Sequence, residues 1–365
     1  MNIGIPKERR PFEYRVGLPP AGVGLFRQHD HKVYVETGAG EGAGFSDGDY
    51  TRAGATVVYS PEEVFTRADL VLKFARPLLD ELERMHPDQA IAGFLHLSAA
   101  RQDKIDLLLR RKIASLAYDQ IMEADGYRPV VAPLSQIGGR MAVQVAALLS
   151  QNNQGGRGIL LGGVTGVPAA EVVILGAGIV GSTAAAGFDA AGAHVTVLDV
   201  DLRRLQELQD RLRGPVVTLL STPHNIARAT AYADIVVGAA LVRGQRAPIV
   251  ITREMVRGMR PRSLILDMSI DEGGCVETSR PTTYSSPTYV EEGVIHFCVP
   301  NMSGVLGRTA THALYGGAYA YLEAIARLGL GPAAEAVPAI QRGLCTFGGE
   351  VRNLTRLTGA GAGAG

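Results

Sequence analysis

Gly176, Gly178 and Gly181 form the spacing G-x-G-x-x-G directly after a short apolar run, Val172–Leu175. Glycines so placed let the backbone turn tightly and approach a pyrophosphate at a helix N-terminus, whose N–H groups and dipole favour an anion. Asp199 ends the next apolar run, 18 residues after Gly181, where a carboxylate can accept hydrogen bonds from ribose hydroxyls. The glycine spacing alone is weak, but strand, loop, helix, strand and terminal acid in this order predict a dinucleotide site.

The acid at position 199 favours NAD, because a carboxylate repels the 2′-phosphate that distinguishes NADP. Arg203 and Arg204 follow closely in the sequence and keep NADP open as the less favoured cofactor. Both arginines are equally explained as solvated charges at the start of a helix. We therefore expect NAD.

Two further polar residues lie at or just after the ends of predicted strands. His96 lies at the end of a predicted strand in the segment Phe94–Ser98, and an imidazole titrates near neutral pH. Asp271 follows the predicted strand Leu264–Ile270 in a turn with two glycines. On the residue pattern alone, His96 is also explained as a hydrogen-bonded structural histidine, and Asp271 as a turn acid or a helix N-cap.

Short β-like runs alternate with helical ones over the first 130 residues, and a long helical pattern begins near Ser135. A second alternating series follows, and the chain then turns helical again. This alternation predicts an α/β fold, with a Rossmann-type NAD-binding domain inserted into a second, discontinuous α/β substrate domain. The expected segments are 1–130 (substrate and catalytic domain), 131–303 (NAD-binding domain with a linking helix), 304–357 (helical return) and 358–365 (Gly/Ala tail).

The bulk composition narrows the function classes. Lysine plus arginine equals aspartate plus glutamate at 36 each, so no electrostatic footprint for nucleic acid or an anionic membrane is present. Three scattered cysteines suit neither a disulfide framework nor a zinc site, so we expect reduced thiols, no metal and a cytoplasmic protein. Glycines, Pro168 and Glu171 interrupt the most apolar stretch, so we expect no membrane-spanning helix.

A series of short motifs runs in order along nearly the whole chain. They are IGIPKE at 3–8, RVGLPPAGV at 15–23, VETGAGEGAGFSDGDY at 35–50, FLHLSA at 94–99, APLSQIGGRMAVQ at 132–144, GGRGILLGGVTGV at 155–167, DEGGCVETSRPTTY at 271–284 and HFCVPNM at 296–302. In these motifs the chain resembles the alanine dehydrogenase family. It resembles the nucleotide-binding subunit of proton-translocating transhydrogenase more distantly.

The resemblance implies reversible oxidative deamination of an L-amino acid to a 2-oxo acid and ammonia, with NAD as hydride acceptor, in a homo-oligomer that is usually a hexamer. It implies that His96 and Asp271 are catalytic and that Arg15 holds the substrate carboxylate through paired hydrogen bonds. Besides the three loop glycines, the residues that it places around the cofactor are Ser135, Ile179, Val180, Asp199, Arg204, Ser221, Ala240, Leu241, Ile270, Val299, Asn301 and Met302.

One departure from the family falls on the substrate side. The family usually reads L-K-V-K-E-P where this chain reads L-K-F-A-R-P at 72–77, so Ala75 replaces a substrate-binding lysine. Lys73 shares a strand face with Ala75, about 6–7 Å away, while Arg76 would reach the pocket only if the strand bends before Pro77. Substitution by either cation stays open. Other departures are Gln136, Met268–Ser269, Ser303–Gly304 and Thr309–Thr311.

Three functions follow from these patterns. The leading one is an NAD-dependent dehydrogenase acting on an amino acid or amine, with specificity altered from alanine and pyruvate. The second is a true L-alanine dehydrogenase in which Lys73 or Arg76 replaces the missing lysine. The third is a non-catalytic NAD-binding regulatory protein, which the presence of Arg15, His96 and Asp271 disfavours.

Overall fold

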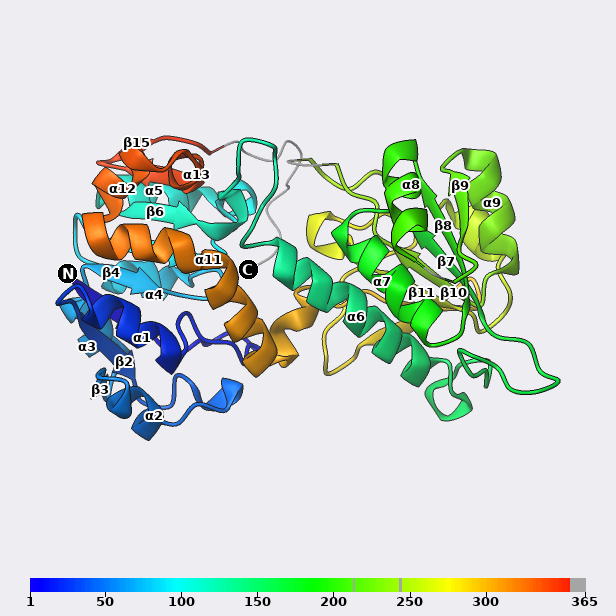
Figure 1. Cartoon of the computed structure of the whole chain (residues 1–365), viewed down its shortest axis with the longest axis horizontal. Helices are drawn as coiled ribbons and strands as arrows, with labels where there is room; N and C mark the ends of the chain where they lie inside the picture. Colours follow the sequence, from blue (N-terminus) through cyan, green and yellow to red (C-terminus); the bar gives the residue numbers. More distant parts are fainter. Residues whose placement is uncertain (213, 243–244, 355–365) are drawn as a thin grey trace. The chain divides into compact units, whose positions relative to one another are not determined.

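The computed structural model describes residues 1–212, 214–242 and 245–354, so the Gly/Ala tail expected at 358–365 lies outside the described residues (Figure 1). The chain divides into two compact units. Among the described residues, unit 1 contains 1–134 and 303–354, and unit 2 lies within 135–302. Unit 2 is therefore inserted into a discontinuous unit 1.

Short runs rich in valine, isoleucine and leucine form the sheet of unit 1, as expected for strands buried on both faces. Among the described residues this sheet has the order β15-β14-β6-β5-β4-β1-β2-β3. Strands β1 to β6 pair in parallel, and β14 and β15 add antiparallel pairs at one edge. The strands are β1 (Asn2–Ile5), β2 (Lys32–Glu36), β3 (Thr56–Val58), β4 (Leu70–Leu72), β5 (Ala90–Gly93), β6 (Ala114–Ala117), β14 (Leu344–Phe347) and β15 (Glu350–Val351).

The helices of unit 1 carry apolar residues that pack with the strands into a buried core, which includes Val71, Ile91 and Leu107. These helices are α1 (Pro20–Arg27), α2 (Asp47–Arg52), α3 (Pro61–Arg67), α4 (Leu79–Arg84), α5 (Gln102–Arg110), α11 (Gly307–Leu328), α12 (Leu330–Ala336) and α13 (Pro338–Gly343). Ser46 and Ser60 cap α2 and α3 through their hydroxyl groups.

The expectation of a helical return over 304–357 needs a correction at its end. After α13 the chain forms the hairpin β14–β15, which joins the unit 1 sheet beside β6. Gly348 and Gly349 have φ values of +61° and +84°, which permit the tight turn, and pairing with distant β6 stabilises β14. The preceding Leu-Cys-Thr-Phe run suits a buried strand.

Unit 2 has a sheet in the order β12-β13-β11-β10-β7-β8-β9 among the described residues. Counted along the chain, its parallel strands follow the order 3-2-1-4-5-6, which is the Rossmann arrangement. The expected fold class is therefore confirmed. The strands are β7 (Glu171–Leu175), β8 (His194–Asp199), β9 (Val217–Leu220), β10 (Ile235–Gly238), β11 (Leu264–Asp267), β12 (Thr288–Glu291) and β13 (Val294–Phe297).

The helices of unit 2 follow its strands in alternation, and its core includes Val173, Val236 and Ile265. They are α7 (Ile179–Ala190), α8 (Leu202–Arg211), α9 (Pro223–Tyr232) and α10 (Arg253–Arg257), while α6 (Ala132–Leu149) runs across the boundary of the two units in the sequence. No described helix is long and apolar enough to cross a membrane.

Candidate functional site

The loop after β7 has the backbone that its glycines predict. Gly176 has φ +106°, and a Cβ there would collide with the carbonyl of Ala239. A Cβ on Gly181 would collide with the carbonyl of Gly176, so this glycine lets α7 pack closely against the strand. Gly178 differs, because a Cβ there would meet no atom within 4 Å. The open space beside Gly178 therefore lies at the first turn of α7.

These residues fit the pyrophosphate of a dinucleotide. Helix α7 is 12 residues long and begins at Ile179 directly after Gly178, so its first N–H groups have no partner within the helix. Ile179 is exposed and Val180 is half-buried at this end. Unpaired N–H groups, the positive end of the helix dipole and a backbone without a side chain are what a phosphate group needs.

Asp199 ends β8 beside the glycine loop and is almost fully buried. Its Oδ2 accepts a hydrogen bond from Ala177 N at 2.6 Å, and its Oδ1 accepts one from Asp201 N at 2.8 Å. A carboxylate has about four acceptor positions, so capacity for ribose hydroxyls remains. Arg204 is exposed on α8, and its Nε lies 3.7 Å from Oδ2 of Asp201.

The other expected cofactor residues of unit 2 lie mostly at one edge of its sheet. Because parallel strands end at the same edge, the segments after β9, β10, β11 and β13 share the edge that carries the glycine loop. These segments contain Ser221, Ala240, Leu241, Ile270, Val299, Asn301 and Met302. Ser135 instead lies on α6.

Asp271 lies at the same edge, in a 3-10 turn after β11. It is exposed, and its Oδ2 accepts a hydrogen bond from Asn301 N at 2.9 Å. Asn301 has φ +52°, a left-handed conformation that is uncommon outside glycine and tends to be retained at functional sites. The structure thus brings two of the sequence-predicted residues, Asp271 and Asn301, into direct contact.

In unit 1, Arg15 follows β1 and is buried in a paired contact. Its Nε and Nη2 each donate to a carboxylate oxygen of Glu13 at 2.5 Å, and its Nη1 donates to Ser303 Oγ at 3.0 Å. The guanidinium carbon lies 3.8 Å from the centre of the Phe74 ring. Carboxylate, hydroxyl and ring face together fix the plane of the guanidinium.

Aromatic rings connect Arg15 to His96. The Phe74 and Phe94 ring centres are 5.7 Å apart, and those of Phe94 and His96 are 6.2 Å apart. His96 is half-buried, and its backbone N–H donates to Asp119 Oδ1 at 3.3 Å. The sequence placed His96 at the end of a strand, but β5 ends at Gly93. His96 instead has φ +45° and precedes a 3-10 turn.

Lys73 is fully buried between two carboxylates that sequence reasoning missed. Its Nζ lies 3.1 Å from Glu8 Oε2 and 2.9 Å from Glu81 Oε1. Burial by itself would lower the pKa of Lys73, but the charges of Glu8 and Glu81 raise it above its ordinary value. Burial also raises the pKa of Glu8, against the opposing effect of Lys73.

The carboxylate of Glu8 also organises the segment after β4. Its Oε1 accepts hydrogen bonds from the backbone N–H groups of Phe74 at 2.6 Å and Ala75 at 3.2 Å. Glu81 Oε2 accepts from Leu78 N at 2.8 Å. The only signal in the sequence was the position of Glu8 within the IGIPKE motif.

Among the described residues, no group of three histidine, cysteine, aspartate or glutamate side chains could hold a metal ion. Cys275, Cys298 and Cys345 are buried free thiols. Burial raises the pKa of all three, so none has the character of an activated thiolate.

Comparisons with known proteins cover both units. The family descriptions "Alanine dehydrogenase/PNT, N-terminal domain" and "Alanine dehydrogenase/PNT, C-terminal domain" match residues 4–138 and 142–354. Alanine dehydrogenase of Methanococcus maripaludis is 44% identical over 96% of this chain and 94% of its own length. The enzyme of Mycobacterium tuberculosis is 40% identical over the same shares.

Solved structures agree with this result. An L-alanine dehydrogenase structure matches with a TM-score of 0.92 at 42% identity, over 96% of each chain. A transhydrogenase structure from Sinorhizobium meliloti has a TM-score of 0.82 at 24% identity, covering 96% of this chain and 98% of that one, which shows a shared fold. On the full-length matches at 40–44% identity, the chain belongs to the alanine dehydrogenase/PNT family.

Proposed function

We propose that this chain is an NAD-dependent oxidoreductase acting on a CH–NH2 group, which converts an L-amino acid into a 2-oxo acid and ammonia. The observation that carries the proposal is its similarity to alanine dehydrogenases at 40–44% identity over 96% of the chain. A dinucleotide loop with open space beside Gly178 supports the cofactor part of the reaction.

The described side chains support a division of roles. NAD, when bound, supplies the acceptor for the hydride that leaves the α-carbon. We assign the substrate carboxylate to Arg15 on the family resemblance, because in this structure its Nε and Nη2 already donate to Glu13 and its ring contact is with Phe74. His96 and Asp271 are the groups that we assign to proton transfer, as water adds to the substrate imine and ammonia leaves.

The carboxylate of Asp199 supports NAD rather than NADP. It is buried beside the glycine loop, and it would repel a 2′-phosphate at the adenosine ribose. Arg204 is the nearby cation whose charge would attract a 2′-phosphate, but it forms an ion pair with Asp201.

We propose that the substrate specificity of this chain differs from that of its relatives. Ala75 is buried and offers only a methyl group where the resemblance expects a lysine. Ser303 stands where the family has proline, and its hydroxyl accepts a hydrogen bond from Arg15 that proline has no side-chain group to accept. We therefore propose a substrate larger or differently charged than alanine.

A second candidate is L-alanine dehydrogenase activity itself, which the names of the relatives favour. Lys73 is poorly suited to replace the missing lysine, because its ammonium is buried between Glu8 and Glu81. Arg76 is half-buried and its guanidinium has no hydrogen bond or ion pair with any described residue, so it is the better substitute.

NADH oxidation separates the two candidates. We would compare pyruvate with larger 2-oxo acids in the presence of ammonia, and assay cyclic imines, which already contain the C=N bond, without it, using the wild type and Ala75→Lys. Altered specificity predicts a larger kcat/KM for another substrate than for pyruvate. It also predicts that Ala75→Lys raises kcat/KM for pyruvate by about 10- to 150-fold, the value of one charge-assisted hydrogen bond. A wild type that prefers pyruvate would contradict altered specificity and support the second candidate.

A further inference from the structure

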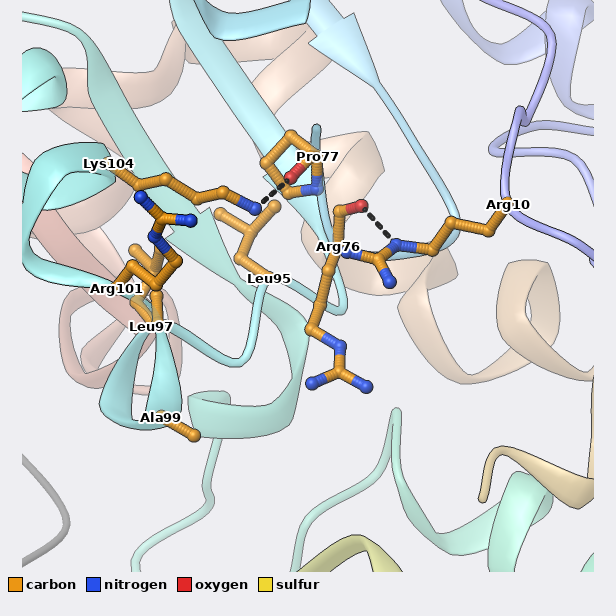
Figure 2. Close-up of a pocket in the computed structure, with 9 residues that line it drawn as sticks. Arg10, Arg76, Pro77, Leu95, Leu97, Ala99, Arg101 and Lys104 are labelled. Atoms are coloured by element: carbon orange, nitrogen blue, oxygen red, sulfur yellow. Dashed lines mark hydrogen bonds between the residues drawn. The ribbon is translucent and has the colours of Figure 1, made fainter. Parts of the chain in front are cut away.

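Four cationic side chains line one small pocket of unit 1 (Figure 2). Arg10 comes from the segment after β1, Arg76 from the segment after β4, and Arg101 and Lys104 from the start of α5. In Figure 2, Lys104 and Arg101 lie on one side of Leu95. Arg76 and Arg10 lie on the other side. The pocket therefore has an apolar floor and a rim of positive charge.

Two backbone carbonyls hold this arrangement in place. Arg10 Nε donates to the carbonyl of Arg76 at 3.1 Å, and Lys104 Nζ donates to the carbonyl of Pro77 at 2.9 Å (Figure 2). These contacts use one donor of each side chain, although an arginine has five N–H donors and a lysine has three. The guanidinium of Arg76 uses none of its donors on another described residue. Many N–H groups are thus available to a bound anion.

The surrounding carboxylates are engaged elsewhere. Glu13 is paired with Arg15, and Glu8 and Glu81 are paired with Lys73. Asp103 is paired with Arg101 at the exposed rim. No ion pair joins Arg10, Arg76 or Lys104 to a carboxylate among the described residues, although the charges of Glu8, Glu13 and Glu81 partly oppose the lowering of the pKa of Arg10, and Asp103 that of Lys104.

Burial and repulsion between these cations lower the pKa of two of them, Lys104 and Arg10. Burial lowers the pKa of Lys104, and the charges of Arg10 and Arg76 lower it further. Burial and then the charge of Arg76 also lower the pKa of Arg10. Cations that merely cover a surface separate in water and repel each other weakly. Cations held close by carbonyl groups over an apolar floor are suited to bind an anion.

We propose that Arg10, Arg76 and Lys104 bind an oxyanion, either a carboxylate or a phosphate group. The pocket is built on the segments that carry the candidate substrate residues, because Arg76 directly follows Ala75, and Leu95 and Leu97 flank His96. One source of the oxyanion is a second acidic group on the amino-acid substrate, and the other is a free anion that acts as an effector. Anion binding at this pocket is inferred from the three cations and does not depend on the proposed function. Only the binding of a substrate carboxylate there rests on the proposed function.

Calorimetric titration of the full chain with inorganic phosphate tests the site directly. At constant ionic strength, we expect saturable binding by the wild type and binding at least about tenfold weaker in Arg76→Gln and Lys104→Gln. Arg110→Gln is the matched control, since Arg110 is an exposed cation on α5 that does not line the pocket. No saturable binding by the wild type, or equal binding by Arg76→Gln and Lys104→Gln, would overturn the proposal.

Kinetics with two classes of substrate then identify the source of the oxyanion. If it is a substrate carboxylate, the ratio of kcat/KM for L-aspartate or L-glutamate to that for L-alanine falls at least about tenfold in Arg76→Gln, and phosphate competes with the dicarboxylic substrate. If it is a free effector, the ratio stays constant, and phosphate changes the wild-type rate but not that of Arg76→Gln. Absence of turnover with every amino acid would refute the proposed function, and the phosphate titration would still decide the site.

Discussion

At the scale of single residues, His96, which we propose for proton transfer, is held in a defined position. Its backbone is left-handed, Asp119 anchors its N–H group, and its ring lies beside Phe94. Strained backbone of this kind persists where the surrounding structure holds it in place. His96 is half-buried, so part of the residue remains accessible to solvent.

Replacing His96 should separate chemistry from cofactor binding. We expect His96→Ala to lower kcat by about 10²- to 10⁴-fold, the range for losing one general acid–base group. NADH affinity, measured by fluorescence titration, should stay within about twofold, since His96 belongs to unit 1 and the glycine loop to unit 2. His86→Ala is a matched control, because His86 is an exposed histidine of the same unit. An unchanged kcat in His96→Ala would remove His96 from the mechanism.

Asp199 makes a separate prediction about the cofactor. Asp199→Ala removes the acceptor for ribose hydroxyls and the repulsion of a 2′-phosphate. We expect the KM for NAD to rise by about 10- to 150-fold and the preference for NAD over NADP to shrink. Steady-state assays with both cofactors measure this, and Asp210→Ala, at an exposed position of α8, serves as the control. A preference for NAD that survives intact would show that Asp199 does not select the cofactor.

Sequence reasoning reached these residues because their motifs are local, but it missed their partners. Glu13 is only two residues from Arg15, yet nothing in the sequence says that the two side chains pair. Lys73 pairs with Glu8 and Glu81, and its contact with Glu8 spans 65 positions of chain. Strand alternation placed Lys73 and Ala75 on one face, but it did not reveal the buried carboxylates that engage the lysine. Such pairs depend on how distant segments meet.

At the scale of elements, the glycine loop offers a matched pair of substitutions. A methyl group on Gly181 collides with the carbonyl of Gly176, while one on Gly178 meets open space. We expect Gly181→Ala to destabilise the protein by about 1–3 kcal/mol or more, as overpacking does. Gly178→Ala should keep its Tm and lose NADH affinity, because the methyl group occupies the space of the pyrophosphate. Thermal melts and fluorescence titrations give both readouts, and loss of stability without loss of affinity in Gly178→Ala would contradict this assignment.

The buried triad of Lys73, Glu8 and Glu81 joins the segments after β1 and β4 to helix α4. Lys73→Met would leave two buried carboxylates without a cation, at a cost of about 3–5 kcal/mol in the free energy of unfolding. Lys7→Met is the control, since Lys7 is exposed and the substitution removes a 3.8 Å contact between its Nζ and Oε2 of exposed Glu41. Urea denaturation measures both, and similar stability for the two variants would show that the triad is not structural.

The triad also has a pH dependence whose sign follows from Lys73. Its pKa is raised above the ordinary value of 10.5 in the folded state, so the contribution to stability is present below pH 10.5 and is lost as the pH rises through the folded pKa. We expect the wild type to lose stability in this alkaline range and Lys73→Met to lose less. Parallel alkaline denaturation curves for the two proteins would contradict this.

Elements with a clear periodic pattern could be predicted, and those that depend on tertiary contacts could not. The Rossmann-type fold of unit 2 could be predicted because its alternating strands and helices and its glycine loop carry local signals. The C-terminal hairpin β14–β15 was missed because its strands are short and its first strand is stabilised by pairing with distant β6. The end of β5 was placed too late because Phe94 and Leu95 are apolar but already belong to the loop that carries His96.

At the scale of the whole molecule, homo-oligomerisation remains a prediction from the family resemblance. Sedimentation velocity of the full chain should show a species heavier than 38.6 kDa, with a hexamer as the expected assembly. A single species at the mass of one chain across the micromolar range would contradict it.

The stoichiometry of the complete reaction decides whether this chain is an NAD-dependent amino-acid dehydrogenase. The full chain would be incubated with NAD and a panel of L-amino acids, and NADH, ammonia and 2-oxo acid would be quantified in the same samples. We expect at least one amino acid to give the three products in equal amounts, with the rate lost in His96→Ala. NAD binding without NADH formation for every amino acid, or NADH formation without ammonia, would contradict an NAD-dependent amino-acid dehydrogenase.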